Sequence, residues 1–130
     1  MVKKRILVVD DEPDFLDVIK SRLESSNYDV ITASSGKEAL AKVKNAKPDV
    51  ALLDIMMPGM DGLQVLKTIR KLNKNLPVFI ITAFSSEERF KLANKFNASG
   101  FIIKTGNLKK EIKNINSILG IADRYRHRKT

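Results

Sequence analysis

The feature that most constrains the fold is a fivefold alternation of short apolar runs with amphipathic segments. The apolar runs have the composition of strands, and they are residues 6–9, 28–32, 50–53, 77–82 and 101–103. Between them, apolar residues recur at helical spacing, as Phe15, Ile19 and Leu23 do. Strands that alternate with helices form a parallel sheet covered on both faces. The sequence therefore predicts an α/β fold, a doubly wound sheet of five parallel strands with five helices.

Capping residues stand between the predicted strands. The expected helix starts are Pro13, Ser35 with Glu38, Asp61 with Gly62, Ser85 with Glu88, and Asn107. The last helix, with Leu108, Ile112, Ile115, Ile118 and Leu119 inward, is expected to end at Gly120. From Arg124 on the chain is basic, and this end is expected to fray. The sequence thus predicts one domain over residues 1–122, followed by a basic tail or truncated linker over residues 123–130.

Composition excludes several kinds of site. The chain of 130 residues is 43% hydrophobic and 30% charged, which suits one globular domain. It has no cysteine, so disulfides, thiolate metal sites and cysteine nucleophiles are excluded. Its one histidine, His127, lies near the end of the chain, which argues against a histidine-based triad. The first residues resemble neither a signal peptide nor a membrane span, so the expected compartment is the cytoplasm, without membrane contact.

The positive charge is concentrated at the end of the chain. The net charge is +9, and residues 104–130 hold eight Lys and Arg against two acids. Such a segment attracts nucleic acid, anionic lipid or an acidic partner, but basic runs are also common as solvated helix faces. Charge alone leaves these interpretations open.

A single carboxylate follows the most uniformly apolar run. Residues 50–53 read as a strand buried on both faces, and Asp54 is the first polar side chain past its carboxyl end. In open parallel sheets ligands bind at that edge. Aspartate also caps turns, so this stretch by itself supports both interpretations.

Other polar residues follow the neighbouring strands. They are Asp10 and Asp11, Thr82 and Ala83, and Lys104. Parallel strands bring these ends to one edge, where clustered carboxylates repel one another unless a cation such as Mg²⁺ joins them. Lys104 can hold a phosphoryl oxygen and Thr82 can donate a hydrogen bond to it. Together with a carboxylate nucleophile, these groups indicate a phosphoryl-transfer site of the aspartyl-phosphate type.

Four stretches of the sequence resemble the receiver domain of two-component response regulators. They are Val8-Val9-Asp10-Asp11-Glu12, the segment from Leu52 through Asp54 and Pro58-Gly59 to Gly62, Ile81-Thr82-Ala83, and Gly100-Phe101-Ile102-Ile103-Lys104. The resemblance covers about residues 4–120. It implies a flavodoxin-like sheet with strand order 2-1-3-4-5 and a phosphorylation-controlled binding switch rather than an enzyme.

The resemblance also implies a role for each acidic residue. Asp54 matches the residue that accepts phosphate from a phosphohistidine. Asp11 matches a direct Mg²⁺ ligand, Asp10 the acid that holds a metal-bound water, and Met56 the position whose backbone carbonyl completes the metal shell, with Asp54 as a further ligand. The implied partners are a sensor histidine kinase or phosphotransfer protein and an unknown downstream protein.

The remaining matched residues respond to the phosphate. Thr82 and Ala83 match the switch positions, and Lys104 matches the phosphate-binding lysine. Phe101 matches the aromatic that turns inward on activation, and with Lys109 it belongs to the expected output face. The added charge would shift a population between two packings of that face.

Two departures from the family pattern have consequences. Receivers usually have a proline after the lysine, joined by a cis bond, but here the residue is Thr105. A cis bond to a non-proline residue costs about 3–4 kcal/mol, so this loop is either trans or strained. Bulky Met56 and Phe84 flank the path that the resemblance assigns to attacking water, which predicts a long-lived phosphate.

Three other functions compete with the receiver. A phosphatase of the haloacid-dehalogenase type would need a second acid two residues after its nucleophile, where this chain has Met56. A nucleotide hydrolase would need a glycine-rich phosphate loop, which the sequence lacks. A nucleic-acid module rests on charge alone, so nucleic acid is expected only through the basic tail or a missing effector domain.

Overall fold

A parallel sheet forms the centre of the molecule. The computed structural model describes residues 3–57, 60–83 and 86–128, and the side chains of these residues except 60 and 122–128. The strands of this sheet are β1 (Arg5–Val9), β2 (Asp29–Ala33), β3 (Val50–Leu53), β6 (Val78–Thr82) and β7 (Gly100–Ile103). Their order is β2-β1-β3-β6-β7, and all neighbours are parallel. In the sheet's own count this is the predicted order 2-1-3-4-5.

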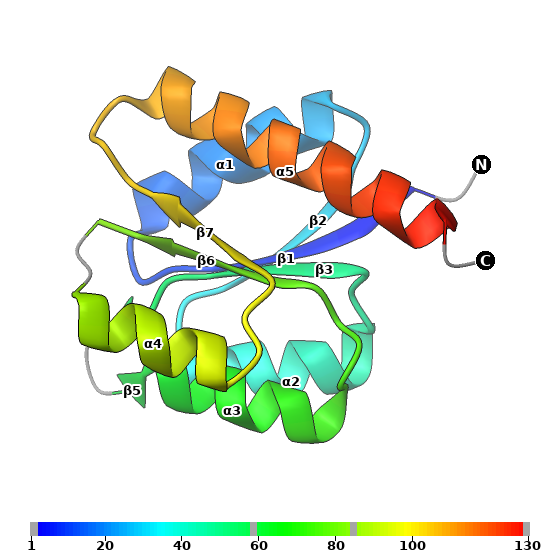
Figure 1. The fold of residues 1–130 in the computed structure, drawn as a ribbon. Coiled ribbons are helices and arrows are strands. Elements are labelled where there is room, and N and C mark those ends of the chain that lie inside the picture. The colour runs from blue at the N-terminus through cyan, green and yellow to red at the C-terminus, as the bar shows by residue number, and fades with distance from the viewer. Residues whose placement is uncertain (1–2, 58–59, 84–85, 129–130) are drawn as a thin grey trace.

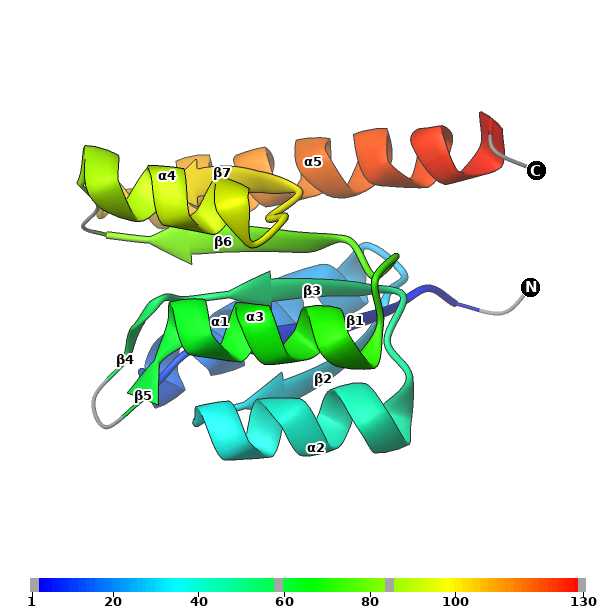
Figure 2. The same cartoon turned by 60° about the horizontal axis from the view of Figure 1, so that its bottom comes forward.

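Helices cover both faces of the sheet. In Figure 1, α1 (Pro13–Ser25) and α5 (Leu108–Arg128) lie on one face. The other face is covered by α2 (Gly36–Ala46), α3 (Gly62–Leu72) and α4 (Glu87–Lys95), as Figure 2 also shows. Side chains of β1 alternate between two cores, since Ile6 and Val8 pack with α1 and α5 whereas Leu7 and Val9 pack with α2 and α3. The predicted fold class is therefore confirmed.

Most predicted helix starts are observed. Pro13 opens α1, Ser35 Oγ accepts the N–H of Glu38 at 3.1 Å, and an Asp61 carboxylate oxygen accepts the N–H of Leu63 at 3.0 Å. The Glu38 carboxylate bonds Ser34 rather than completing a capping box with Ser35.

The N-cap of α4 lies one residue after the predicted one. Ser85 lies outside the described residues, and the N-cap of α4 is Ser86, whose hydroxyl accepts the N–H of Arg89. Adjacent serines offer the same capping chemistry, so the pattern alone could not choose between them.

The prediction that the last helix ends at Gly120 was wrong. Helix α5 continues to Arg128, and among described residues the glycine with positive φ is Gly106, not Gly120. A glycine inside a helix costs about 1 kcal/mol relative to alanine but does not end the helix unless the chain turns left-handed there. Leu108, expected inward, is 37% exposed.

Two short strands were not predicted. β4 (Met56–Met57) and β5 (Met60–Asp61) pair antiparallel, outside the central sheet, just after β3. In the described part of the chain, no helix is both long and apolar enough to cross a membrane.

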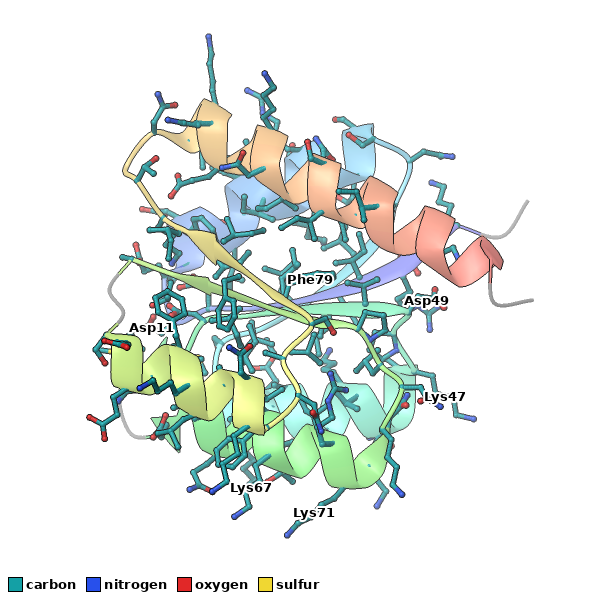
Figure 3. All side chains as sticks on the ribbon, in the orientation of Figure 1. Asp11, Lys47, Asp49, Lys67, Lys71 and Phe79 are labelled. Carbon is teal, nitrogen blue, oxygen red and sulfur yellow. The ribbon has the colours of Figure 1, made fainter. Side chains whose placement is uncertain are left out.

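The sheet has two chemically distinct ends. Figure 3 shows Asp11 at one end of the sheet, and Lys47 and Asp49 at the opposite end. Asp11 marks the carboxyl end of β1, where the residues predicted for phosphoryl transfer gather.

Candidate functional site

Two buried aspartates follow neighbouring strands. Val9 pairs with Leu53 in the register of β1 and β3, so the next residues, Asp10 and Asp54, emerge at the same edge. The backbone holds both: the N–H of Asp54 donates to the carbonyl of Val9 at 3.0 Å, and the N–H of Asp10 donates to the carbonyl of Ala33 at 3.1 Å. Asp10 is 1% exposed and Asp54 is 5% exposed. Burying two carboxylates is costly unless a cation compensates them.

The Asp54 carboxyl has a raised pKa. Burial is the largest cause, and the charges of Asp10 and Asp11 add to it. The N–H of Met56, which donates to Asp54 Oδ1 at 2.9 Å, and the ammonium of Lys104 oppose the rise. Together they bring the pKa from 3.8 to about 6 in the metal-free protein. A bound cation would favour the charged carboxylate.

Lys104 supplies the compensating positive charge. Its Nζ lies 2.5 Å from Asp10 Oδ2, 3.5 Å from Asp54 Oδ2 and 3.6 Å from Glu12 Oε1. Burial would lower the pKa of Lys104, but the hydrogen bond and charge of Asp10, with Asp54 and Glu12, raise it overall. Lys104 is therefore a charged ammonium that joins the two buried aspartates.

The sequence did not reveal the ring that covers this ammonium. Lys104 Nζ lies 4.2 Å from the ring centroid of Phe15 in the first turns of α1. At this distance a cation–π interaction forms, and it stabilises an ammonium that has lost contact with water. Phe15 was assigned to the apolar face of its helix, and no local pattern marks a ring that also contacts a lysine 89 positions further along the chain.

The acidic side chains at the end of β1 fit a divalent cation. Carboxylate oxygens of Asp10, Asp11 and Glu12 all lie within 4.8 Å of one another. Glu12 is exposed, so a metal here could keep several waters, as Mg²⁺ prefers. Asp54 is joined to this group through Lys104, and Met56 contacts Asp54 through its N–H. Glu12 was not among the residues that the sequence predicted as metal ligands.

The remaining predicted residues lie on β6, β7 and α5. Thr82 is fully buried at the end of β6, and its carbonyl accepts the N–H of Lys104 at 2.9 Å, while Ala83 is exposed. Half-buried Phe101 packs edge-to-face on Phe90, with centroids 4.8 Å apart. Phe84, expected on the water path, lies outside the described residues.

Lys109 lies on a basic groove rather than among the carboxylates. Arg22 of α1 and five residues of α5 line an open groove of about 540 Å³. The α5 residues are Lys109, Ile112, Lys113, Asn116 and Ser117. Among the described residues no acid lines this groove, so it favours an anionic surface.

The loop after Lys104 adopts the trans alternative. No peptide bond among the described residues is cis. The N–H of Thr105 donates to Glu111 Oε1 at 3.1 Å. Glu111 is not among the residues predicted for the site, although its position four residues before the buried Ile115 indicates that it shares the inward face of the helix.

A flavodoxin-like sheet that gathers acidic residues, a hydroxyl and a lysine at its carboxyl edge defines a receiver-like protein. The family model described as the response regulator receiver domain matches residues 6–116, and the chain belongs to this family. Receiver domains accept a phosphoryl group in two-component signalling, act as phosphorylation switches, are phosphorylated by histidine kinases and bind Mg²⁺ at an acidic pocket.

Two curated relatives are transcriptional regulators. The chain is 41% identical over 103 residues to the alkaline phosphatase synthesis transcriptional regulatory protein PhoP of Bacillus subtilis (strain 168), covering 79% of this chain and 43% of that protein. It is 35% identical over 124 residues to the probable transcriptional regulator ycf27 of Porphyridium aerugineum, covering 95% and 51%. The chain thus spans about half the length of these relatives.

Solved structures show the same fold. A CheY-like receiver domain protein from Methanospirillum hungatei JF-1 has a TM-score of 0.85 and 31% identity, with 95% of this chain and 99% of that chain covered. The response regulator TrrA of Thermotoga maritima, in complex with Mg(2+)-BeF, has a TM-score of 0.75 and 37% identity, with 88% and 97% covered.

Proposed function

We propose that Asp54 is the phospho-acceptor of a Mg²⁺-dependent switch. The observation that carries this proposal is the position of Lys104, whose ammonium joins Asp10 and Asp54 in a nearly dry site. A buried ammonium beside a nucleophilic carboxylate is suited to neutralise the charge of an incoming phosphoryl group.

In the proposed reaction, an Asp54 oxygen attacks the phosphorus of a phosphohistidine on a sensor kinase or phosphotransfer protein. The new P–O bond forms as the P–N bond breaks, and the released imidazole takes a proton. The N–H of Met56 holds the Asp54 carboxylate in place. Lys104 then shifts its hydrogen bonding toward a phosphoryl oxygen, and the Thr82 hydroxyl, at the end of the adjacent strand, is suited to donate to the same group.

The residues available for the metal are Asp10, Asp11 and Asp54, with the backbone carbonyl of Met56; the structure adds Glu12 as a neighbour. When bound there, Mg²⁺ would neutralise phosphoryl oxygen charge. This set fits the ion because it offers only oxygen donors and retains access to water.

The output face is proposed to include Phe101 and Lys109, with Thr82 and Ala83 as the switch positions beside the site. Phe101 of β7 contacts Phe90 of α4, so we expect a shift of Thr82 toward phosphate to repack this face. The groove at Lys109 is suited to an acidic partner protein. We place the switch in the cytoplasm, with residues 1–122 as the receiver and residues 123–130 as a tail or linker. Any nucleic acid binding would arise through this tail or through a missing effector domain.

Intact mass spectrometry after incubation with acetyl phosphate and Mg²⁺ tests the proposal. The wild-type protein should gain about 80 Da, the mass of one phosphoryl group. Asp54→Ala should gain nothing, and EDTA should prevent the gain in wild type. The matched control is Asp29→Ala, an aspartate at the opposite end of the sheet, which should react like wild type. An adduct of equal yield on Asp54→Ala would rule out Asp54 as the acceptor.

A further inference from the structure

A third buried acid lies outside the group of carboxylates described above. Glu111, in the first turn of α5, is 5% exposed. Its own N–H donates to the carbonyl of Asn107 at 3.0 Å, so it belongs to the regular helix. Its Oε1 accepts the N–H of Thr105 at 3.1 Å. Since phosphoryl transfer has no direct use for Glu111, its burial calls for another explanation.

The start of α5 makes this burial tolerable. Asn107 caps the helix by accepting the N–H of Lys110 at 3.2 Å. Exposed helix N–H groups and the helix dipole favour a negative charge in the first turn. The Thr105 N–H adds a hydrogen bond to the charged group, and such bonds are stronger than those between neutral groups. Glu111 is therefore held in a defined position by its own helix.

Two hydrogen bonds fix the backbone on either side of Lys104. On one side, the N–H of Lys104 donates to the carbonyl of Thr82 at 2.9 Å, which ties it to β6. On the other side, the N–H of Thr105 donates to Glu111, which ties it to α5. The peptide groups before and after the lysine are thus both anchored, and the Lys104 side chain leaves the backbone between them.

Besides a bond within the loop, from the Asn107 N–H to Thr105 Oγ1 at 3.3 Å, the described residues provide little packing around it. Residues 105–107 are exposed, and a Cβ built on Gly106 would meet no atom within 4 Å. A trans Thr105 supplies the N–H that a proline at this position would lack. The Glu111 contact therefore replaces packing as the restraint on the loop.

We propose that Glu111 is a positioning residue that holds Lys104 in register with Asp10 and Asp54 by anchoring the following peptide group. The proposal rests on the assigned role of Lys104 in phosphoryl transfer. It also links the site to the basic groove, because Glu111 lies on the same two turns of α5 as Lys109 and Lys113. An acidic partner that moves these turns would move Lys104 as well.

The first test measures the seating of Lys104 without using phosphorylation. A limiting amount of an amine-acylating reagent is added, and the labelling of Lys104 is compared with that of exposed Lys71 on α3 by peptide mass spectrometry. Glu111→Met, which removes the acceptor, should raise the ratio about tenfold, because a lost hydrogen bond to a charged group has an effect of this size. Glu111→Gln keeps an oxygen acceptor and should stay within about twofold of wild type.

A control separates positioning from general destabilisation. Ile115→Val shortens a fully buried side chain one turn further along α5 without touching the loop. It should leave the Lys104 labelling ratio unchanged. An unchanged ratio in Glu111→Met, or an equal rise in Ile115→Val, would overturn the proposal.

The second test measures the rate of phosphorylation by acetyl phosphate at saturating Mg²⁺. Glu111→Met should lower the rate about tenfold, since small misplacements of a charged group are costly in transfer reactions. In a Lys104→Ala background the same change should have no further effect. An equal loss in both backgrounds would mean that Glu111 does not act through Lys104 and would overturn the proposal.

The two tests distinguish the two proposals. If the wild-type protein takes up no phosphate but the labelling ratio responds as expected, the proposed function fails and the positioning role stands. If Glu111→Met does not fold, amide hydrogen exchange in the wild-type protein decides. Thr105 should then exchange at least about tenfold more slowly than an unstructured amide, as a hydrogen-bonded N–H does, and unprotected exchange would overturn the proposal.

Discussion

The two ends of the parallel sheet both carry ion pairs, but in opposite environments. At the amino end, Arg5 Nε lies 2.9 Å from Asp29 Oδ2, and each side chain is 44% exposed. At the carboxyl end, Lys104 Nζ lies 2.5 Å from Asp10 Oδ2, and these side chains are 9% and 1% exposed. The pair at the amino end is half-exposed to water, whereas the pair at the carboxyl end lies in a region of low dielectric constant.

This difference separates stabilising chemistry from functional chemistry. An exposed pair such as Arg5–Asp29 contributes little, because water and salt screen it. Buried charges cost desolvation energy, and a packed apolar core would hold the strands together without them. Four acids and one lysine are nevertheless gathered at the carboxyl end. Such an excess of negative charge is typical of a site that binds a cation and then accepts a phosphoryl group.

The largest effect is expected from a substitution that removes the buried ion pair between Lys104 and Asp10. Lys104→Met should lower the free energy of unfolding in EDTA by about 3 kcal/mol, because it leaves Asp10 and Asp54 buried without their cation. Arg5→Met, at the exposed end, should lower it by about 1 kcal/mol or less. Urea unfolding measures both. If the two substitutions cost the same, the contrast between the ends has no energetic basis.

Metal binding should affect only the carboxyl end. Mg²⁺ at about 100 times its dissociation constant should raise the free energy of unfolding by about 2.7 kcal/mol, and EDTA should remove this gain. Asp11→Asn should reduce the gain at the same Mg²⁺ concentration, whereas Asp29→Asn should leave it intact. A gain that is equal in all three proteins would indicate nonspecific binding.

The raised pKa of Asp54 predicts a pH-dependent cost in the metal-free protein. The folded state holds the Asp54 proton more tightly than the unfolded state, since burial raises the pKa from 3.8 to about 6. The contribution of Asp54 to the free energy of unfolding is therefore greatest below about pH 4. It falls as the pH rises from there through about 6. Asp54→Asn should be more stable than wild type by about 3 kcal/mol at pH 7.5 in EDTA, and the difference should shrink to about 0.5 kcal/mol at pH 4.

The control for this pH dependence is Asp29→Asn, whose side chain is half-exposed at the opposite end. It should change stability by about 0.5 kcal/mol or less at either pH. Urea unfolding at pH 4 and pH 7.5 gives both comparisons. A difference between Asp54→Asn and wild type that is the same at both pH values would show that the carboxyl is not the cause.

The fold was predictable because its signals are local. Uniformly apolar runs such as residues 50–53 mark buried strands, and the parallel arrangement follows from their alternation with helices. The sheet order came from the family resemblance. The errors also have local causes: Ser85 and Ser86 offer the same cap, and Gly120 is tolerated within a helix that does not turn there.

The site was predictable only where it follows directly from strand ends. Asp10, Asp54, Thr82 and Lys104 each come directly after a strand or at its last residue, so the topology alone brings them together. Phe15 contacts Lys104 and Glu111 contacts the neighbouring Thr105, both from helices, and these contacts depend on three-dimensional packing that no spacing encodes. Except for Glu12, which joins the acidic group, the missed residues lie around the lysine rather than among the residues that carry the chemistry.

The smallest expected effect compares two lysine–aromatic pairs. Lys104 Nζ lies 4.2 Å from the Phe15 ring centroid in the buried site, whereas Lys67, which extends from α3 in Figure 3, lies 5.6 Å from the Phe96 ring and is exposed. Cation–π attraction strengthens as the ammonium loses water.

Double-mutant cycles with lysine to Met and phenylalanine to Leu isolate each coupling energy. We expect about 1–2 kcal/mol for Lys104 with Phe15 and about 0.5 kcal/mol for Lys67 with Phe96. Raising the salt concentration should weaken the exposed coupling more than the buried one, because only the exposed pair is well screened. Equal couplings with equal salt dependence would mean that the environment of Lys104 is no drier than the surface, which would remove the basis for the contrast between the two ends of the sheet.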